Sequence, residues 1–111
     1  DMKLVRGNES DVSKYLKGQI QNSDRLTAVL TVDEHKDMFD TVSSEKLNIK
    51  VLSLGSSKNL ESIAYNLFDI LRKCDELGVE YIFSESFDER GIGKAIMNRL
   101  KKAAGFEIID V

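Results

Sequence analysis

Two turns of this 111-residue chain carry residue types that can bind a phosphate or carboxylate. The turn Ser53-Leu54-Gly55-Ser56-Ser57 precedes a helical pattern, so its N–H groups and hydroxyls suit an anion at the positive end of a helix. The turn Gly91-Ile92-Gly93 opens another helical pattern, but Ile96 replaces the third glycine of a dinucleotide loop and the turn follows the fourth predicted strand. Capping explains the serines equally well, and tight packing explains the glycines better, so we favour structural roles for both turns.

The single histidine and the single cysteine are the remaining candidates for chemistry. His35 lies beside Asp33, Glu34 and Asp37, a grouping that suggests metal ligands. Carboxylates in a first helical turn complement the helix dipole, however, and we interpret this segment as a solvated acidic turn. Cys74 continues an apolar helical stripe and is expected in the core. The sequence therefore predicts no catalytic set and no metal site within this chain.

The composition is that of an ordinary globular domain. Apolar residues make up 41% of the chain, and the formal charge is -3, with acidic and basic residues interleaved. Direct nucleic-acid binding is not expected, since it would require a strongly basic face. The apolar runs are far shorter than the roughly 20 residues of a membrane helix. One cysteine forms no internal disulfide and fits a reducing compartment, so we expect a cytoplasmic protein that makes no membrane contact.

The apolar pattern predicts alternating strands and helices. The strands are expected at 2–5, 26–32, 49–54, 79–83 and 106–111. Helices are expected at 11–20, after Asp33, after Asn59 and at 92–104, with Asp33 and Asn59 as N-caps. The helix after Asn59 is the longest, and Gly78 ends it. Its apolar residues at steps of three and four are Leu60, Ile63, Ala64, Leu67, Phe68, Leu71, Cys74 and Leu77.

This alternation defines the expected fold. Successive apolar residues, as in Ala28-Val29-Leu30 and Tyr81-Ile82-Phe83, indicate strands buried on both faces, which is typical of parallel sheets between helices. We therefore predict a single α/β domain over residues 1–111, a three-layer α/β/α sandwich with a mostly parallel sheet of about five strands. Rossmann-like and flavodoxin-like strand orders both fit the pattern.

Candidate functional residues follow from this fold. Ligands of open α/β sheets gather at the carboxyl ends of the strands. In the last helix, Ile92, Ala95, Ile96, Leu100 and Ala103 are expected to face the sheet, with Asn98 near the boundary of that face. The candidate interface or ligand residues are Ser53, Gly55, Ser56, Ser84, Glu85, Asn98 and Arg99.

Several segments in order resemble one known family. They are Val51-Leu52-Ser53-Leu54-Gly55-Ser56, Ile63-Ala64-Tyr65-Asn66-Leu67-Phe68, Asp75-Glu76-Leu77-Gly78-Val79 and the helical segment 91–104. From about Leu26 to Ala104 the chain resembles the C-terminal domain of the two-domain threonylcarbamoyl-AMP synthases, whose N-terminal domain is YrdC-like. Glu85 matches the family, whereas Ser86-Phe87-Asp88 lacks the glycine and proline that usually follow.

The resemblance implies a role in making threonylcarbamoyl-adenylate, the activated donor for modifying the adenosine beside the tRNA anticodon. The family is a nucleotidyltransferase that uses threonine, bicarbonate, ATP and Mg, and its substrate site lies in the YrdC-like domain. The resemblance therefore implies an accessory or regulatory domain, with no catalytic residue and no cofactor of its own. Its partner would be a YrdC-like catalytic domain in the same polypeptide. Because the chain starts Asp1-Met2-Lys3, we expect a fragment of a longer protein.

Two other functions fit the pattern. A free-standing nucleotide or small-molecule binding module is supported by the serine-rich turn and weakened by the incomplete glycine motif. A homodimerisation domain would use an exposed apolar strand or helix face. The sequence alone leaves the oligomeric state open.

Overall fold

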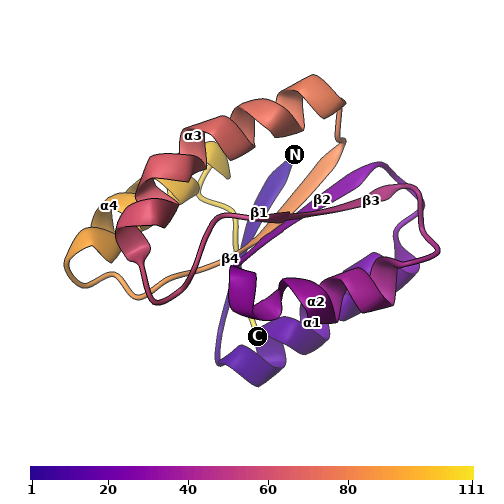
Figure 1. Ribbon diagram of the computed structural model, residues 1–111, viewed down its shortest axis with the longest axis horizontal. Helices are drawn as coiled ribbons and strands as arrows, with labels where there is room; N and C mark the ends of the chain where they lie inside the picture. The colour runs from indigo at the N-terminus through magenta and orange to yellow at the C-terminus, as the bar shows by residue number, and fades with distance from the viewer.

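Five parallel strands form the central sheet of the computed structural model, which describes residues 1–111 (Figure 1). Strands and helices alternate along the whole chain. The elements are β1 Met2–Arg6, α1 Glu9–Asn22, β2 Thr27–Thr31, α2 Asp33–Ser43, β3 Ile49–Ser53, α3 Leu60–Leu77, β4 Tyr81–Glu85, α4 Ile92–Ala103 and β5 Ile108–Asp110.

The helices cover the sheet in two layers. Figure 1 shows α1 and α2 on one face of the sheet and α3 and α4 on the other. The strand order is β3-β2-β4-β1-β5, and every neighbouring pair is parallel. The predicted three-layer α/β/α fold is confirmed. The order corresponds to the Rossmann order 3-2-1-4-5 with β1 and β4 exchanged, so β4 lies between β1 and β2.

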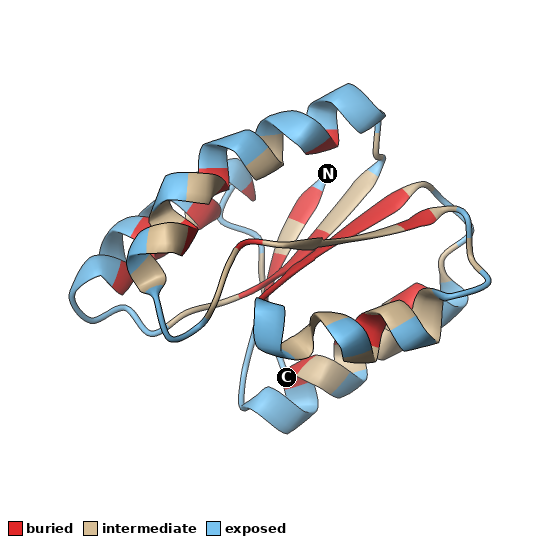
Figure 2. Cartoon of the chain, in the orientation of Figure 1, coloured by how far each residue is buried: buried red, intermediate tan, exposed pale blue.

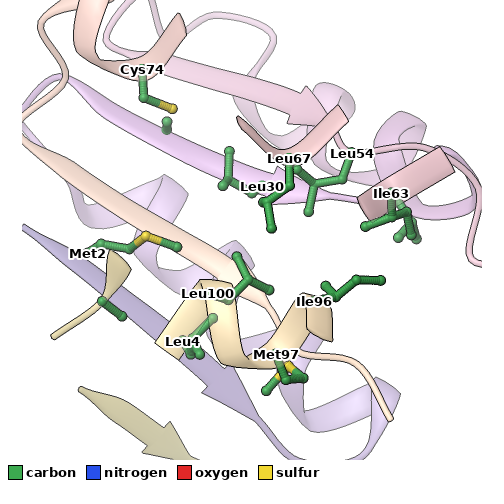
Figure 3. Packing of buried hydrophobic residues seen from close by; sticks show 13 residues of the cluster. Met2, Leu4, Leu30, Leu54, Ile63, Leu67, Cys74, Ile96, Met97 and Leu100 are labelled. Atoms are coloured by element: carbon green, nitrogen blue, oxygen red, sulfur yellow. The ribbon is translucent and has the colours of Figure 1, made fainter. Parts of the chain in front are cut away.

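Each face of the sheet has its own apolar core. Side chains alternate along β1 and β2, so Leu4 and Leu30 pack toward α3 and α4 while Val5 and Val29 pack toward α1 and α2. Figure 2 shows the buried residues on the strands and the inner faces of the helices. Cys74 belongs to the α3/α4 core drawn in Figure 3, as predicted. Burial and the neighbouring Asp75 raise the pKa of the Cys74 thiol to about 11.

The long helix α3 has the predicted ends. The Asn59 side chain caps its first turn by accepting from the Ser62 N–H, and Gly78 ends the helix in a left-handed conformation. The buried apolar face of α3 is narrower than predicted, because Phe68 is 53% exposed and Leu77 lies at the surface. The outer side of α3 therefore carries an exposed aromatic residue.

Three local expectations were wrong. Val32 rather than Asp33 precedes the first turn of α2, and no side chain caps that helix. In α4 the buried residues are Gly93, Ile96, Met97 and Leu100. Ile92, Ala95 and Ala103, which were expected to face the sheet, therefore lie outside the packed face. Strand β4 begins two residues later than expected and continues to Glu85. This last shift places Ser84 and Glu85 inside the sheet instead of in the loop after it.

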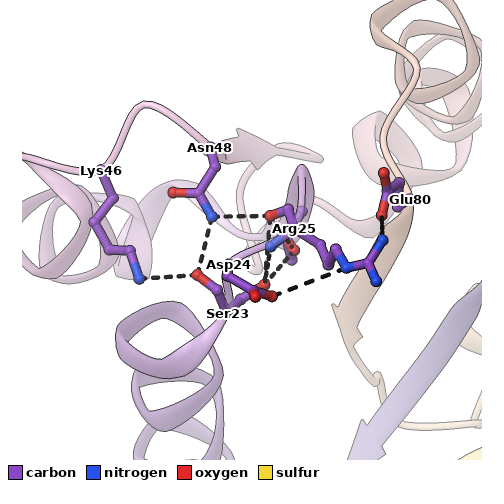
Figure 4. Close-up of polar contacts among 7 residues, drawn as sticks. Ser23, Asp24, Arg25, Lys46, Asn48 and Glu80 are labelled. Atoms are coloured by element: carbon purple, nitrogen blue, oxygen red, sulfur yellow. Dashed lines mark hydrogen bonds and ion pairs between the residues drawn. The ribbon is translucent and has the colours of Figure 1, made fainter.

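The amino edge of the sheet is closed by polar contacts among its own loops (Figure 4). The Lys46 ammonium and the Asn48 side-chain amide each donate to the Ser23 carbonyl at 3.0 Å. Arg25 donates to the Glu80 carboxylate at 3.1 Å and joins the entry of β2 to that of β4. None of the helices is long and apolar enough to cross a membrane.

Candidate functional site

A buried carboxylate lies at the carboxyl end of the sheet. Glu85 is the last residue of β4 and is only 8% exposed. Its carboxylate accepts hydrogen bonds from the Thr31 hydroxyl on β2 and from Nδ1 of His35, at 3.0 Å, on the first turn of α2. A buried carboxylate is stable only where such donors compensate its lost hydration. The two contacts therefore make Glu85 a junction between β4, β2 and α2.

His35 extends this junction to the first helix. Its Nε2 lies 2.7 Å from Oε1 of Glu9 on α1, and its side chain is 19% exposed. Both ring nitrogens face carboxylate oxygens, which only accept, so the doubly protonated imidazolium satisfies both contacts. Desolvation opposes that charge, but the hydrogen bonds and charges of Glu85 and Glu9 outweigh it and raise the pKa of His35.

This Glu85–His35–Glu9 cluster borders an open hollow of about 420 Å³. The hollow lies where the loops after β1, β2 and β4 meet, and Gly7, Ser57, Ser86 and Phe87 also line it. The helices after β1 and β2 cover one face of the sheet, and the helix after β4 covers the other. Open α/β sheets bind ligands at this kind of position, where the connections that follow neighbouring strands go to opposite faces of the sheet.

The serine turn beside the hollow is held by two carboxylates from α2. The Ser53 hydroxyl donates to Asp33, and the Ser56 hydroxyl donates to Glu34 at 2.6 Å. The Ser57 N–H donates to the other oxygen of Glu34 at 2.8 Å. These hydrogen bonds lower the pKa of Glu34 to about 2, and the bond from the Ser56 hydroxyl has the largest effect. Donors suited to an anion are thus already occupied by carboxylates of this chain.

Gly55 and Ser84 have local structural contacts. The Gly55 carbonyl accepts from the Asp33 N–H at 2.9 Å, and its φ of 132° suits glycine. Ser84 is buried and pairs in register with Leu4 and Leu30, so it points toward the α3/α4 core. Its neighbour Glu85 points to the opposite face. Ser84 and Glu85 therefore do not share one site.

Asn98 and Arg99 lie apart from the hollow, on the exposed side of α4. The guanidinium carbon of Arg99 is 3.7 Å from the centre of the Phe68 ring on α3, a cation–π contact. Arg99 takes part in no ion pair with a carboxylate of this domain. The seven candidate residues consequently fall into separate groups on two faces of the sheet.

Sequence reasoning missed the role of His35. The residue was expected in a solvated turn, but the structure buries most of it between two carboxylates. Its partner Glu85 follows 50 residues later, and only the insertion of β4 between β1 and β2 brings them together. The structure brings together no group of three or more His, Cys, Asp or Glu side chains able to hold a metal ion.

Comparison with known proteins decides the family. The family model described as threonylcarbamoyl-AMP synthase, C-terminal domain, matches residues 1–105. The chain belongs to this family. A threonylcarbamoyl-AMP synthase of Bacillus subtilis is 38% identical over 96 residues, which is 86% of this chain. A threonylcarbamoyl-AMP synthase of Pyrococcus abyssi is 48% identical over 62 residues, which is 56% of this chain and 18% of that protein.

Solved structures agree with the family. The crystal structure of Pyrococcus abyssi Sua5 complexed with L-threonine covers all of this chain with a TM-score of 0.79 and 32% identity. The C-terminal Sua5 domain from Pyrococcus horikoshii covers it with a TM-score of 0.66 and 28% identity, and 96% of that solved chain is matched. The present chain spans 26% of the Bacillus subtilis protein and 30% of the Pyrococcus abyssi chain. It therefore corresponds to the C-terminal part of much longer relatives.

Proposed function

We propose that this chain is the accessory domain of a threonylcarbamoyl-AMP synthase, a nucleotidyltransferase that acts in the threonylcarbamoyladenosine modification of tRNA. The observation that carries the proposal is the match of residues 1–105 to the C-terminal domain of that family, in relatives about three to four times as long. Its partner is a YrdC-like catalytic domain in the same polypeptide, and its compartment is the cytoplasm. The domain itself contacts neither nucleic acid nor membrane.

Catalysis belongs, in this proposal, to the partner domain. That domain uses threonine, bicarbonate and ATP with Mg, and it forms the adenylate. The contacts of the present domain support this division, because the Glu85–His35–Glu9 cluster uses its hydrogen bonds to join β4, α2 and α1 to one another. The serine turn likewise directs its donors to Asp33 and Glu34. These groups stabilise the carboxyl edge and leave no oriented nucleophile and base.

The domain then contributes by covering or steadying the catalytic domain. A rigid two-core sandwich suits this task, since packed layers hold a contact surface in place without local folding. Steadying the catalytic domain raises its rate by keeping the reacting groups oriented. The contribution is thus structural and regulatory.

The test is product formation by residues 1–111 alone. Purified chain is incubated with threonine, bicarbonate, ATP and Mg, and threonylcarbamoyl-adenylate is measured by mass spectrometry. We expect cooperative unfolding, showing a folded domain, together with no product above the rate without protein. Product formation by this chain would refute the assignment of catalysis to another domain.

A small-molecule module is the second candidate, and the hollow beside Glu85 and His35 favours it. Equilibrium dialysis of the chain against nucleotides separates the two functions. Binding that His35→Ala abolishes in a folded variant would support a ligand site at this edge, whereas no binding supports the accessory role.

A further inference from the structure

The exposed side of α4 carries charge of one sign. Lys94, Asn98 and Lys102 stand at i, i+4 and i+8, so they share a face, with Ala95 and Arg99 beside them. This face lies opposite the buried residues of the helix. No acidic residue occurs anywhere in α4. Such a stripe is unexpected in a chain of net charge -3.

Most of these cations lack a partner within the domain. Lys101, at the edge of the stripe, pairs with Glu89 in the preceding loop. Asp69 on α3, the acidic residue nearest in sequence to Phe68, pairs with Arg72 of its own helix. Lys94, Arg99 and Lys102 take part in no ion pair. Their charges are therefore available to another molecule.

Phe68 of α3 borders the stripe. The Arg99 guanidinium carbon lies 3.7 Å from the centre of the Phe68 ring, and this contact restrains the guanidinium at the surface. Tyr65, one turn earlier on α3, is 82% exposed. A notch of about 130 Å³ lies beside Arg99, lined by Ala64 of α3 and Ala95 of α4 among others. Tyrosine and arginine are, with tryptophan, the residue types enriched where protein contacts carry most of their binding energy.

We propose that this α3/α4 face, made of Tyr65, Phe68, Lys94, Asn98, Arg99 and Lys102, binds a carboxylate-bearing surface of the catalytic domain in the same polypeptide. The inference rests on the proposed function and names the surface that the accessory role uses. The Arg99 fork matches a carboxylate in two parallel hydrogen bonds. Phe68 and Tyr65 supply the apolar contact around it.

The charge distribution favours this occupant over a second copy of the chain. A symmetric dimer brings the same surface of both copies together. Here that contact would place the unpaired cations of one copy against those of the other, and like charges across an interface cost binding free energy. A nucleic acid is also disfavoured, because three unpaired cations in a chain of net charge -3 fall short of a phosphate-binding footprint.

The experiment uses the two-domain polypeptide with a protease site introduced before Asp1. After cleavage, the binding of the two halves is measured by calorimetry at low and high salt. Arg99→Glu/Lys102→Glu is expected to weaken their Kd by about tenfold or more, since it replaces attraction by repulsion at two positions of the face. Lys94→Glu, at an exposed position, is expected to weaken it less and serves if the double variant fails to fold.

The matched control is Lys14→Glu/Lys17→Glu on α1, which reverses two unpaired lysines on the other layer. It is expected to leave the Kd unchanged. Equal Kd values for wild type and the α4 variants, or no association of the wild-type halves, would overturn the inference. A tRNA mobility shift or a dimer formed by residues 1–111 and lost in Arg99→Glu/Lys102→Glu would also overturn it. Threonylcarbamoyl-adenylate synthesis by the uncleaved wild type, measured in parallel, tests the proposed function separately.

Discussion

Nδ1 of His35, on the first turn of α2, lies 3.0 Å from the carboxylate of Glu85 at the buried end of β4. The pair joins the centre of the sheet to the α1/α2 layer, and Glu9 completes it from α1 at 2.7 Å. The three residues come from segments separated by 26 and 50 positions. Their contact therefore depends on the tertiary fold, and a loss of the contact would report a change in that fold.

Removing His35 should destabilise the domain. His35→Ala leaves Glu85 with the Thr31 hydroxyl as its remaining side-chain donor, and an under-satisfied buried group costs about 1–3 kcal/mol. Glu9→Gln is the matched control, because the Glu9 side chain is 75% exposed and an exposed pair contributes about 0–1 kcal/mol. Urea unfolding of both variants gives the comparison. Equal losses of unfolding free energy in the two variants would show that the buried contact stabilises the domain no more than the exposed one.

The charge of His35 makes stability depend on pH. Its pKa is raised in the folded state, so its contribution is complete below the unfolded value of about 6.5 and is lost as the pH rises through the folded pKa. The free energy of unfolding should fall over that window in wild type and change less in His35→Gln.

The same ionisation is directly visible by NMR, since the chain has a single histidine. The imidazole resonances should titrate above about 6.5, and Glu85→Gln should lower the midpoint by removing the buried charge. A wild-type midpoint at or below the ordinary histidine value would mean that the ring does not lie between the two carboxylates.

Gly93 should tolerate no side chain. A Cβ atom there would lie 1.9 Å from the carbonyl oxygen of Asp88, so Gly93→Ala must displace backbone and should cost about 1–3 kcal/mol or more. Gly18, inside α1, is the control because its Cβ would meet no atom within 4 Å. Gly18→Ala should stabilise by about 0.5–1 kcal/mol through its better helix propensity. Thermal unfolding of both variants tests the contrast, and a neutral Gly93→Ala would contradict the packing of α4 against the preceding loop.

The sequence predicts the layers of this fold better than its sites. Periodic apolar residues and local signals, such as Asn59 and Gly78, identify the helices because those interactions span a few positions. The sequence leaves the strand order open, because nothing local specifies that β4 inserts between β1 and β2. His35 illustrates the consequence. Its neighbours in sequence indicate a solvated turn, and its partner Glu85 becomes visible only once the strands are ordered.

For the candidate residues too, the sequence predicts local position but not the partners that tertiary packing supplies. Ser53 and Ser56 were placed correctly at the end of β3, but their carboxylate partners on α2 depend on how that helix packs. Arg99 is an interface candidate from the sequence and lies on the exposed side of α4, whereas its contact with Phe68 depends on the position of α3. Roles for these residues in ligand or domain contact stay predictions.

The central claim is that residues 1–111 assist a catalytic domain to which they are joined. The most direct measurement is the initial rate of threonylcarbamoyl-adenylate formation by that catalytic domain with and without this domain, at equal and saturating threonine, bicarbonate and ATP. We predict that deletion lowers the rate by about tenfold or more, which corresponds to about 1.4 kcal/mol of lost transition-state stabilisation. A folded catalytic domain that keeps its full rate without residues 1–111 would contradict the account.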